Sequence, residues 1–253
     1  RLPERALPTF FHNAGVSVKA ILAEAAPKPK PNVVITLSGD YPSYVTPSGR
    51  FSFLTEAWSQ TVSLESFTES CEQLTTAAWV ETVTLRFSDL SANLATLYAM
   101  RRALAKLTEA GKTVHAHLST LELRQLYLAS VATTISMPES AVIFLGGSAF
   151  VQSFYGNALD RLGFKFDKLA IAEYKNAYDN FVRPSMSDAQ REQYSALLKS
   201  IEQHIVGTLA EARGSSEDTV RGWLHDGLAS AEVLAARGVI DQLAYDDEVI
   251  DDD

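Results

Sequence analysis

The 253-residue chain carries 31 acidic and 22 basic side chains, a formal net charge of −9, and 46% of its residues are hydrophobic. A chain of this length forms one large domain or two small ones, and this apolar fraction is enough for a sizeable core. The acidic balance excludes nucleic acid as the main partner, because few cations are left to neutralise phosphates.

Cysteine content and apolar runs restrict the class of protein further. Cys71 is the only cysteine, which excludes a disulfide within the chain and a cysteine-rich zinc site. No apolar run approaches the roughly 18 residues of a membrane-spanning helix. The chain begins at Arg1 without a signal-peptide pattern, so we expect a processed or shortened product. No Gly-x-Gly-x-x-Gly or Walker segment occurs, and we expect no cofactor.

The two ends of the chain differ in composition from its middle. Residues 1–26 have the pattern of amphipathic helices, and PKPKP at Pro27–Pro31 forms a short stiff linker. We therefore expect an N-terminal helical arm and linker over residues 1–31, followed by one domain over residues 32–245. The acidic tail, residues 246–253, is expected to fray.

Strands and helices are predicted to alternate between these ends. Apolar runs predict strands at Val33–Gly39, Val80–Phe87, Lys112–Leu118, TTISM, AVIFL and Phe164–Ala172. Helical spacing predicts helices at Ser63–Trp79, Leu94–Ala110, Leu121–Ala132, Phe150–Leu162, Ser187–Ala212, Ser216–His225 and Ser230–Arg237. Residues 40–60 are polar and predict a long loop. The alternation indicates β-α-β crossovers and a mainly parallel sheet, in an α/β fold.

Several short motifs, in their order along the chain, resemble the signal peptide peptidase family, also called protease IV. They are YLAS at Tyr127–Ser130, the EYK and FVRPSMSDAQRE segments within Glu173–Glu192, and GLASAEVLAARGVIDQL at Gly227–Leu243. The resemblance covers residues 32–244. It implies the fold shared by Clp proteases and crotonases, a ββα superhelix with a mainly parallel sheet.

The resemblance also implies an activity and a location. Members of the family cleave peptides with a serine nucleophile and a lysine general base, and leftover signal peptides in the membrane are their usual substrates. In the long form of the family, an N-terminal copy of the domain gives the lysine and a C-terminal copy gives the serine. We accordingly expect a membrane-associated protein on the extracytoplasmic side. Proteins of this fold often form rings, so a homo-oligomeric ring is also expected.

Lys175 matches the family's catalytic lysine through its setting. It follows a tyrosine and a predicted strand, and it precedes an extended segment and a Met-Ser helix start. The resemblance therefore implies that Lys175 is catalytic. The alternative is an ordinary surface lysine that pairs with Glu173 or Asp179.

The chemistry of a general base explains why such a setting is needed. A lysine accepts a proton only when it is neutral, and its ordinary pKa of about 10.4 leaves it charged at neutral pH. Apolar surroundings disfavour the charged form. We expect Tyr174, Tyr178 and Phe181 to shield Lys175 from water, so that its amine takes the proton of a serine hydroxyl.

The family's serine motif is altered in this chain. That motif, Asn-Ser-Pro-Gly-Gly, follows a strand, and its glycines let backbone N–H groups form an oxyanion hole. The matching segment, LRFSDLSANLA at Leu85–Ala95, places Asp89 at the position of the nucleophile and Leu-Ser-Ala in place of Pro-Gly-Gly. Ser88 and Ser91 lack the glycine turn, so we expect them to be loop or helix-cap serines.

A chain with the base and without the nucleophile is typical of the N-terminal half of the long form. We expect Lys175 to act on a serine from a C-terminal half or a paralogous chain, with peptide substrates bound in an extended conformation. One alternative is a non-catalytic pseudo-peptidase that binds peptides or scaffolds an oligomer. Another is a crotonase-like acyl-CoA enzyme, which is an analogy of fold alone.

Two further patterns have more than one interpretation. His115 and His117 share one face of a predicted strand, which suits a metal, but no third ligand is apparent and we expect no metal site. The helix predicted at Ser187–Ala212 has an apolar stripe that belongs either to the core or to a subunit contact. The stripe consists of Tyr194, Leu197, Leu198, Ile201, Ile205 and Leu209.

Overall fold

The computed structural model describes residues 19–20, 32–44, 62–169 and 171–249. The chain divides into two compact units, which we call unit 1 (Arg1–Gly146 with Leu209–Asp253) and unit 2 (Gly147–Thr208). Residues 147–208, which lie within the domain expected over residues 32–245, pack mainly among themselves. The predicted N-terminal arm and linker lie outside the described residues except for Lys19 and Ala20.

Unit 1 is built on a six-stranded sheet with the order β1-β2-β3-β4-β6-β8. The strands are β1 (Lys19–Ala20), β2 (Asn32–Gly39), β3 (Thr82–Leu90), β4 (Thr113–Leu118), β6 (Thr134–Met137) and β8 (Gln242–Leu243). Every neighbouring pair is parallel except β1 and β2, which are antiparallel. The prediction of an α/β fold with a mainly parallel sheet is confirmed.

A second, two-stranded sheet completes the strand pattern. It pairs β5 (Thr120–Glu122) with β7 (Val142–Phe144) in parallel. β4 leads into β5 and then into helix α5 (Leu123–Ala129), and β6 leads into β7 along an equivalent path. The first strand of each pair, β4 or β6, lies in the large sheet, and the second strand, β5 or β7, lies in the small sheet. This is the winding of the predicted ββα superhelix.

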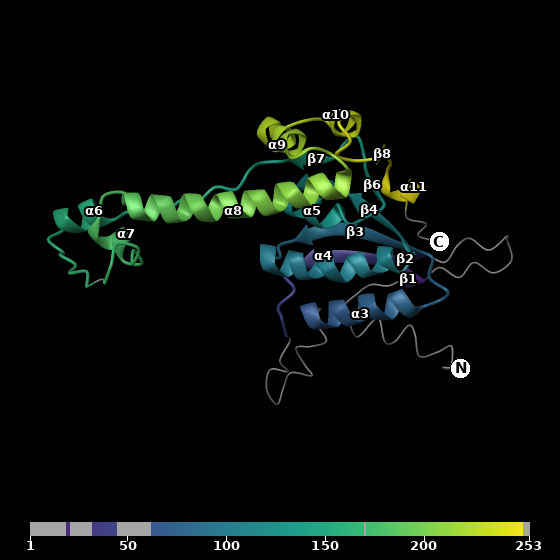
Figure 1. Cartoon of the computed structure of the whole chain (residues 1–253), viewed down its shortest axis with the longest axis horizontal. Helices are drawn as coiled ribbons and strands as arrows, with labels where there is room; N and C mark the ends of the chain where they lie inside the picture. The colour runs from purple at the N-terminus through teal and green to yellow at the C-terminus, as the bar shows by residue number, and fades with distance from the viewer. Residues whose placement is uncertain (1–18, 21–31, 45–61, 170, 250–253) are drawn as a thin grey trace. The chain divides into compact units, whose positions relative to one another are not determined.

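Helices cover the large sheet and the end of unit 1. They are α3 (Leu64–Thr76), α4 (Leu94–Glu109), α5, α9 (Glu217–Asp226), α10 (Ala231–Ala236) and α11 (Asp246–Val249). Ser63, Asn93, Ser216 and Ser230 cap α3, α4, α9 and α10 by accepting a backbone N–H of the first turn. α3 and α4 lie side by side on one face of the sheet (Figure 1).

The core of unit 1 is formed by the central strands and the inner face of α4. β2 and β3 have successive buried residues, such as Val33 and Ile35 on β2 and Val83 and Leu85 on β3. Runs of consecutive buried residues, Val33–Ile35 and Val83–Leu85, are typical of parallel strands that are covered on both faces. α4 buries residues at helical spacing, and these are Leu97, Met100, Ala103, Leu104 and Leu107.

Both ends of the described chain differ from the prediction. Lys19–Ala20 forms β1 on the edge of β2 instead of a helix, and this pairing satisfies edge backbone groups of β2. The first residues of the acidic tail form helix α11 instead of fraying. The reason is that Asp246 contacts Arg86 and His117 of the sheet.

Unit 2 contains α6 (Gly156–Arg161), α7 (Asp179–Val182) and most of α8 (Asp188–Arg213), and α6 and α7 lie together at one end of α8 (Figure 1). The long helix predicted at Ser187–Ala212 is confirmed as α8. Of its apolar stripe, Ile205 and Leu209 are buried, whereas Leu197 is 53% exposed. The stripe is therefore core only near the C-terminal end of the helix.

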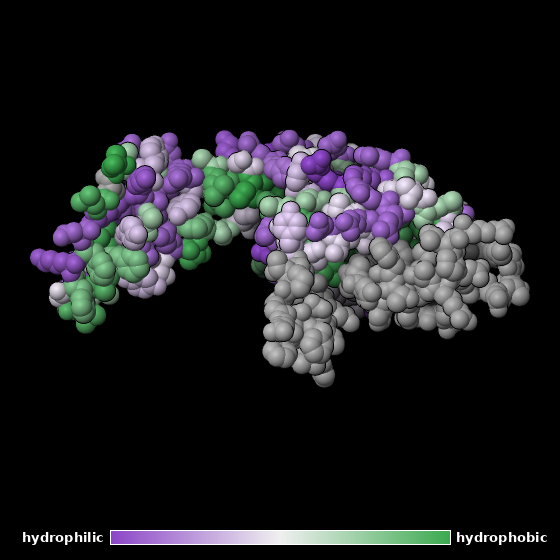
Figure 2. Space-filling model, turned by 90° about the horizontal axis from the view of Figure 1, so that it is seen from below, coloured by the Kyte–Doolittle hydropathy of each residue, from purple (hydrophilic) through white to green (hydrophobic). Residues whose placement is uncertain are grey.

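The predicted strand Phe164–Ala172 is not formed in the described part of unit 2. Phe164, Phe166 and Ile171 are all exposed, and the described residues of unit 2 offer no strand to pair with. Figure 2 shows hydrophobic surface on unit 2, around α6 and α7. A strand pattern without a pairing partner thus leaves the segment irregular.

Unit 2 is held together by aromatic contacts and a close backbone approach. Phe181 of α7 stacks on Phe166 at 5.7 Å between ring centroids, and Phe150 stacks on Tyr194 of α8 at 3.9 Å. Gly156, the first residue of α6, is buried against the backbone of Arg183. A Cβ at Gly156 would lie 2.7 Å from the Arg183 carbonyl oxygen, so only glycine fits this contact.

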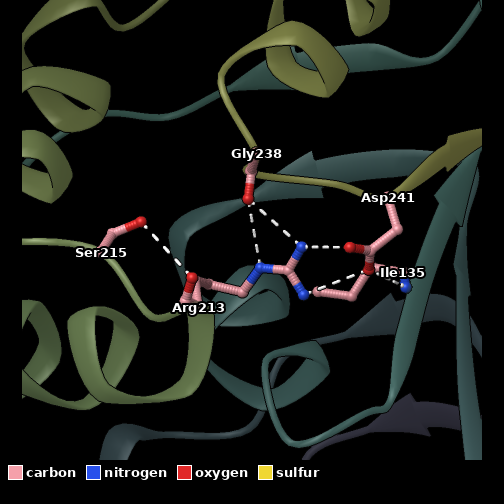
Figure 3. A network of polar contacts seen from close by, with 5 residues as sticks. All are labelled: Ile135, Arg213, Ser215, Gly238 and Asp241. Carbon is pink, nitrogen blue, oxygen red and sulfur yellow. Dashed lines mark hydrogen bonds and ion pairs between the residues drawn. The ribbon is translucent and has the colours of Figure 1, made fainter.

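A bidentate ion pair connects the C-terminal end of α8 to the sheet of unit 1 (Figure 3). Arg213 Nη2 and Nη1 lie 2.6 and 3.1 Å from Asp241 Oδ1 and Oδ2. The same guanidinium donates through Nε and Nη2 to the carbonyl oxygen of Gly238, at 3.2 Å each. Asp241 Oδ2 in turn accepts the backbone N–H of Ile135 on β6 at 2.7 Å.

The charge of Asp241 depends on this network. Partial burial raises the pKa of the Asp241 carboxyl, but the hydrogen bonds from Arg213 and Ile135 outweigh burial, so the pKa lies below its ordinary value. A carboxyl with a lowered pKa stabilises the folded state above its unfolded pKa, and this contribution is lost as the pH falls through the folded pKa.

We predict that Asp241→Asn lowers the free energy of unfolding of unit 1 by about 1 kcal/mol at neutral pH, because one charged partner of Arg213 is lost in a partly exposed site. The difference between wild type and variant should shrink as the pH falls below 4, in urea denaturation followed by circular dichroism. Asp226→Asn, in the exposed pair with Arg237, is the control and should change stability by less than about 0.5 kcal/mol. An equal effect of both substitutions would contradict the role of the network.

We predict that Gly156→Ala destabilises α6 and α7 by about 1–3 kcal/mol, because the new methyl group meets the Arg183 backbone. Hydrogen exchange of the α6 and α7 amides measures the effect. The control is Gly147→Ala, where an added Cβ has no atom within 4 Å. Unchanged exchange in the Gly156 variant would show that the backbone can move apart at no cost.

Candidate active site

Lys175 lies in a turn of unit 2 and not at the end of a strand. Its backbone N–H faces the carbonyl oxygen of Ala172 at 3.4 Å, and the N–H of Asn176 donates to the carbonyl of Tyr174 at 3.1 Å. The second bond spans two residues and makes Lys175 the centre of a γ-turn. Ala172 has a φ of 74°, a left-handed conformation that costs a non-glycine residue about 1–2 kcal/mol.

Both neighbours of Lys175 are hydrogen-bonded to consecutive residues of α8. Tyr174 Oη donates to Glu192 Oε2 at 3.1 Å, and Asn176 Nδ2 donates to Gln193 Oε1 at 2.9 Å. The hydrogen bond to Glu192 and the charge of this carboxylate raise the pKa of Tyr174, which keeps its hydroxyl a neutral donor. The turn is thereby attached to the helix on both sides of the lysine.

Among the described residues, the aromatic enclosure predicted for Lys175 is not formed. Lys175 is exposed, and Tyr174, Tyr178 and Phe181 keep 47%, 67% and 39% of their surface accessible. These rings do not exclude water from the amine in the single chain.

The alternative of a surface ion pair is not formed either. Among the residues that the structure describes, Lys175 makes no ion pair with Glu173 or Asp179. Asp179 is instead buried at the start of α7 and pairs with Lys168. The negative charge of the buried Asp179 carboxylate is therefore already balanced by Lys168.

The segment that matches the family's serine motif has no nucleophile turn. β3 continues through Leu90, so Ser88 lies in a strand and not in a loop, and Asp89 beside it is exposed. The N–H of Ser91 donates to the carbonyl of Gly39 at 2.9 Å, and the cap of α4 is Asn93 and not a serine. The described backbone has no left-handed residue between Ser88 and Asn93. A strand that runs directly into a capped helix does not direct two N–H groups at one oxygen.

A second polar cluster lies in unit 1, where His115, His117 and Ser136 meet on neighbouring strands β4 and β6. His115 Nε2 and His117 Nδ1 lie 2.8 and 2.9 Å from the hydroxyl of Ser136. His117 Nε2 lies 2.6 Å from Asp246 Oδ1, and Arg86 Nη2 donates to Asp246 Oδ2 at 2.6 Å. The contact at Nε2 does not have the geometry of a hydrogen bond.

These distances fix the direction of the hydrogen bonds in the cluster. A nitrogen that faces a carboxylate at this separation carries a proton, so we assign the single proton of a neutral His117 to Nε2, which leaves Nδ1 as the acceptor. The Ser136 hydroxyl then donates to His117, and its oxygen accepts from His115 Nε2. Burial lowers the pKa of His115, with a further contribution from His117, which favours this neutral arrangement.

The cluster has the composition of a serine–histidine–aspartate triad, but a substrate cannot reach it. The side chains of Ser136 and His117 are fully buried, so no substrate carbonyl reaches the hydroxyl. The two histidines considered for a metal are engaged with Ser136, and the described residues contain no group of three His, Cys, Asp or Glu placed to hold an ion. We therefore assign the cluster to holding α11 on the sheet.

We predict that Asp246→Ala lowers the free energy of unfolding of unit 1 by about 1–3 kcal/mol, because His117 Nε2 is left buried without a partner. Urea denaturation measures the loss. The control is Asp247→Ala, which removes the exposed neighbouring carboxylate and should cost less than about 0.5 kcal/mol. Equal stability of the Asp246 variant and wild type would show that α11 contributes nothing to the fold.

Helix length and polarity are also relevant to a membrane location. Among the described residues, no helix is both long and apolar enough to cross a bilayer. α8 has 26 residues, but its surface is mostly polar.

Comparisons with known proteins agree with the motifs in the sequence. The chain is 29% identical to "Serine protease SPPA, chloroplastic" of Arabidopsis thaliana over 168 residues, which is 66% of this chain and 25% of that protein. It is 28% identical to "Protease 4" of Salmonella typhi over 148 residues, 57% of this chain and 24% of that protein. The chain thus spans about a quarter of the length of these relatives.

Structural and family comparisons complete these findings. An enoyl-CoA hydratase/isomerase family member is similar with a TM-score of 0.47 and 12% identity, over 90% of this chain and 69% of that chain. Residues 106–252, more than half of the chain, match Peptidase family S49. The resemblance to protease IV is thereby confirmed, and the chain belongs to Peptidase family S49.

Proposed function

We propose that this chain is the lysine-contributing half of a serine–lysine endopeptidase that degrades signal peptides or other unfolded, membrane-associated peptides. One observation carries the proposal. The chain keeps Lys175 on a turn that is attached to α8 on both sides, whereas Asp89, at the end of β3, stands where the family has its serine. The base is retained and the nucleophile is absent, so the serine comes from a second half or a paralogous chain.

The exposure of Lys175 supports a requirement for this partner. A lysine amine in water is protonated and has no lone pair to accept a proton. The partner that brings the serine would also cover the turn and exclude water, which favours the neutral amine. Exposed apolar side chains near the turn, including Tyr178 and Ile171, supply surface for such a contact.

In the assembled site, the proton of the serine hydroxyl passes to the neutral amine of Lys175 as the oxygen attacks the peptide carbonyl. The resulting ammonium gives its proton to the departing amine, which leaves an acyl-enzyme. Water then hydrolyses the ester, again with the amine as base. The partner's backbone N–H groups would stabilise the oxyanion, since the segment at Ser88–Asn93 has no turn suited to this role.

The remaining parts of the proposal concern assembly and location. We place the protein in a homo-oligomeric ring at the extracytoplasmic side of a membrane, where unfolded and signal-peptide-like segments are available. The exposed apolar surface of unit 2 supports assembly (Figure 2). Apolar, extended peptides fit a site formed between chains, because neither chain alone would expose a complete reactive centre.

A pseudo-peptidase that binds peptides without cleaving them is the second candidate. Two observations favour it: the replacement of the serine by Asp89, and the exposure of Lys175 among the residues that the structure describes. It differs from the first candidate in one respect, because it needs no reaction at Lys175.

We predict that the purified chain neither cleaves a fluorogenic signal peptide nor reacts with a fluorophosphonate probe for active serines. Mixing with the serine-bearing half should restore cleavage, and Lys175→Ala in the mixture should reduce kcat at least 10³-fold, as expected for a residue of a catalytic unit. The control is Lys165→Ala, an exposed lysine of the same unit.

Three outcomes separate the candidates. Cleavage by the chain alone would overturn the need for a partner. Cleavage by the mixture that survives Lys175→Ala would overturn the role of the lysine. Peptide binding without cleavage in the mixture would favour the pseudo-peptidase.

A further inference from the structure

We propose that Glu192 and Gln193 of α8 are positioning residues for Lys175, acting through Tyr174 and Asn176. This inference deepens the proposed function and rests on it. It concerns the two hydrogen bonds that flank the lysine and assigns them a role in aiming its amine.

The two bonds form a bracket around a single residue. Tyr174 and Asn176 are the residues directly before and after Lys175, and their acceptors Glu192 and Gln193 are consecutive on α8. The γ-turn places Lys175 between the two anchored side chains. Its backbone therefore cannot swing without breaking at least one bond, whereas its side chain stays exposed and is left available for a reaction partner.

The helix turn that carries the acceptors is itself held in place. Gln190 is fully buried, its N–H donates to Ser187 Oγ at 3.2 Å, and its side chain donates to Gln152 Oε1 at 2.9 Å. Tyr194 stacks on Phe150. Glu192 and Gln193 lie between these two fixed residues, so the bracket is attached to a rigid base.

The strained backbone before Lys175 also supports a positioning role. Ala172 holds a left-handed φ of 74° although it is not glycine, and it faces the N–H of Lys175. Such a conformation persists only where its surroundings hold it, and it is concentrated at functional sites. Exposed hydrogen bonds add little to stability, so a pair of them at this one turn is better explained by orientation than by stability.

Orientation matters because the amine has to meet a hydroxyl from another chain. Reaction rates between held groups fall steeply when one of them is misplaced by about 1 Å. A turn that is free to move would present the amine in many directions and lose rate without losing substrate binding. The bracket should therefore affect kcat and leave KM unchanged.

The first test measures the turn in the chain alone, with limited trypsin digestion at the Lys175–Asn176 bond. The double substitution Glu192→Ala and Gln193→Ala removes both acceptors from exposed helix positions and keeps good helix formers there. We expect cleavage after Lys175 to become about tenfold faster, because the turn opens more often. Cleavage after Lys165 in the same digest is the internal control and should not change.

The second test measures kcat and KM of the chain mixed with the serine-bearing half. The double alanine variant should lose about 10- to 100-fold in kcat at constant KM. Glu192→Gln and Gln193→Glu keep an acceptor oxygen at each position, and together they should restore most of the kcat and the trypsin resistance. Gln203→Ala, at another exposed position of α8, controls for general effects on the helix.

The outcomes distinguish this inference from the proposed function. If Lys175→Ala abolishes cleavage but the double alanine variant keeps full kcat, the positioning role is overturned, whatever the trypsin result. If Lys175→Ala leaves cleavage intact, the proposed function fails, and the positioning role fails with it even if trypsin cleavage is faster. Loss of kcat that the acceptor-keeping variant does not restore would also overturn the positioning role, because the loss would not depend on the hydrogen bonds.

Discussion

Parallel pairing of β2, β3 and β4 is the constraint on which unit 1 depends. Parallel strands cannot be joined by tight turns, so each connection crosses the sheet and carries a helix. α3 and α4 are these connections, and they bury one face of the strands. Residues at the carboxyl ends of the strands then lie along one edge of the sheet. That edge receives Asp246, which is 160 residues from Arg86 in sequence.

The elements predicted correctly from the sequence are those whose signal is local. β2 and β3 are rich in apolar and β-branched residues, and α4 combines helical spacing with Asn93 as its cap. The prediction of a strand at Phe164–Ala172 was wrong, because an apolar run forms a strand only where a partner strand is available.

The candidate site was predictable only in part. The resemblance identified Lys175 and the replacement of the serine by Asp89. It did not identify Glu192 and Gln193, because contacts across 18 and 17 residues follow no period in the sequence. The sequence also predicted an aromatic enclosure of Lys175, which the described residues do not form. A motif can identify a residue, but whether other side chains cover it depends on packing.

The burial of His115 beside Ser136 and His117 has a consequence for the behaviour of unit 1 in mild acid. Burial, and secondarily His117, disfavours the charged form of His115, so its pKa lies below the ordinary value. The unfolded chain accepts a proton on this ring near pH 6.5, earlier than folded His115 does. Acidification below about pH 6.5 therefore lowers the folding stability of unit 1 through His115, at a pH above that at which carboxylates take up protons.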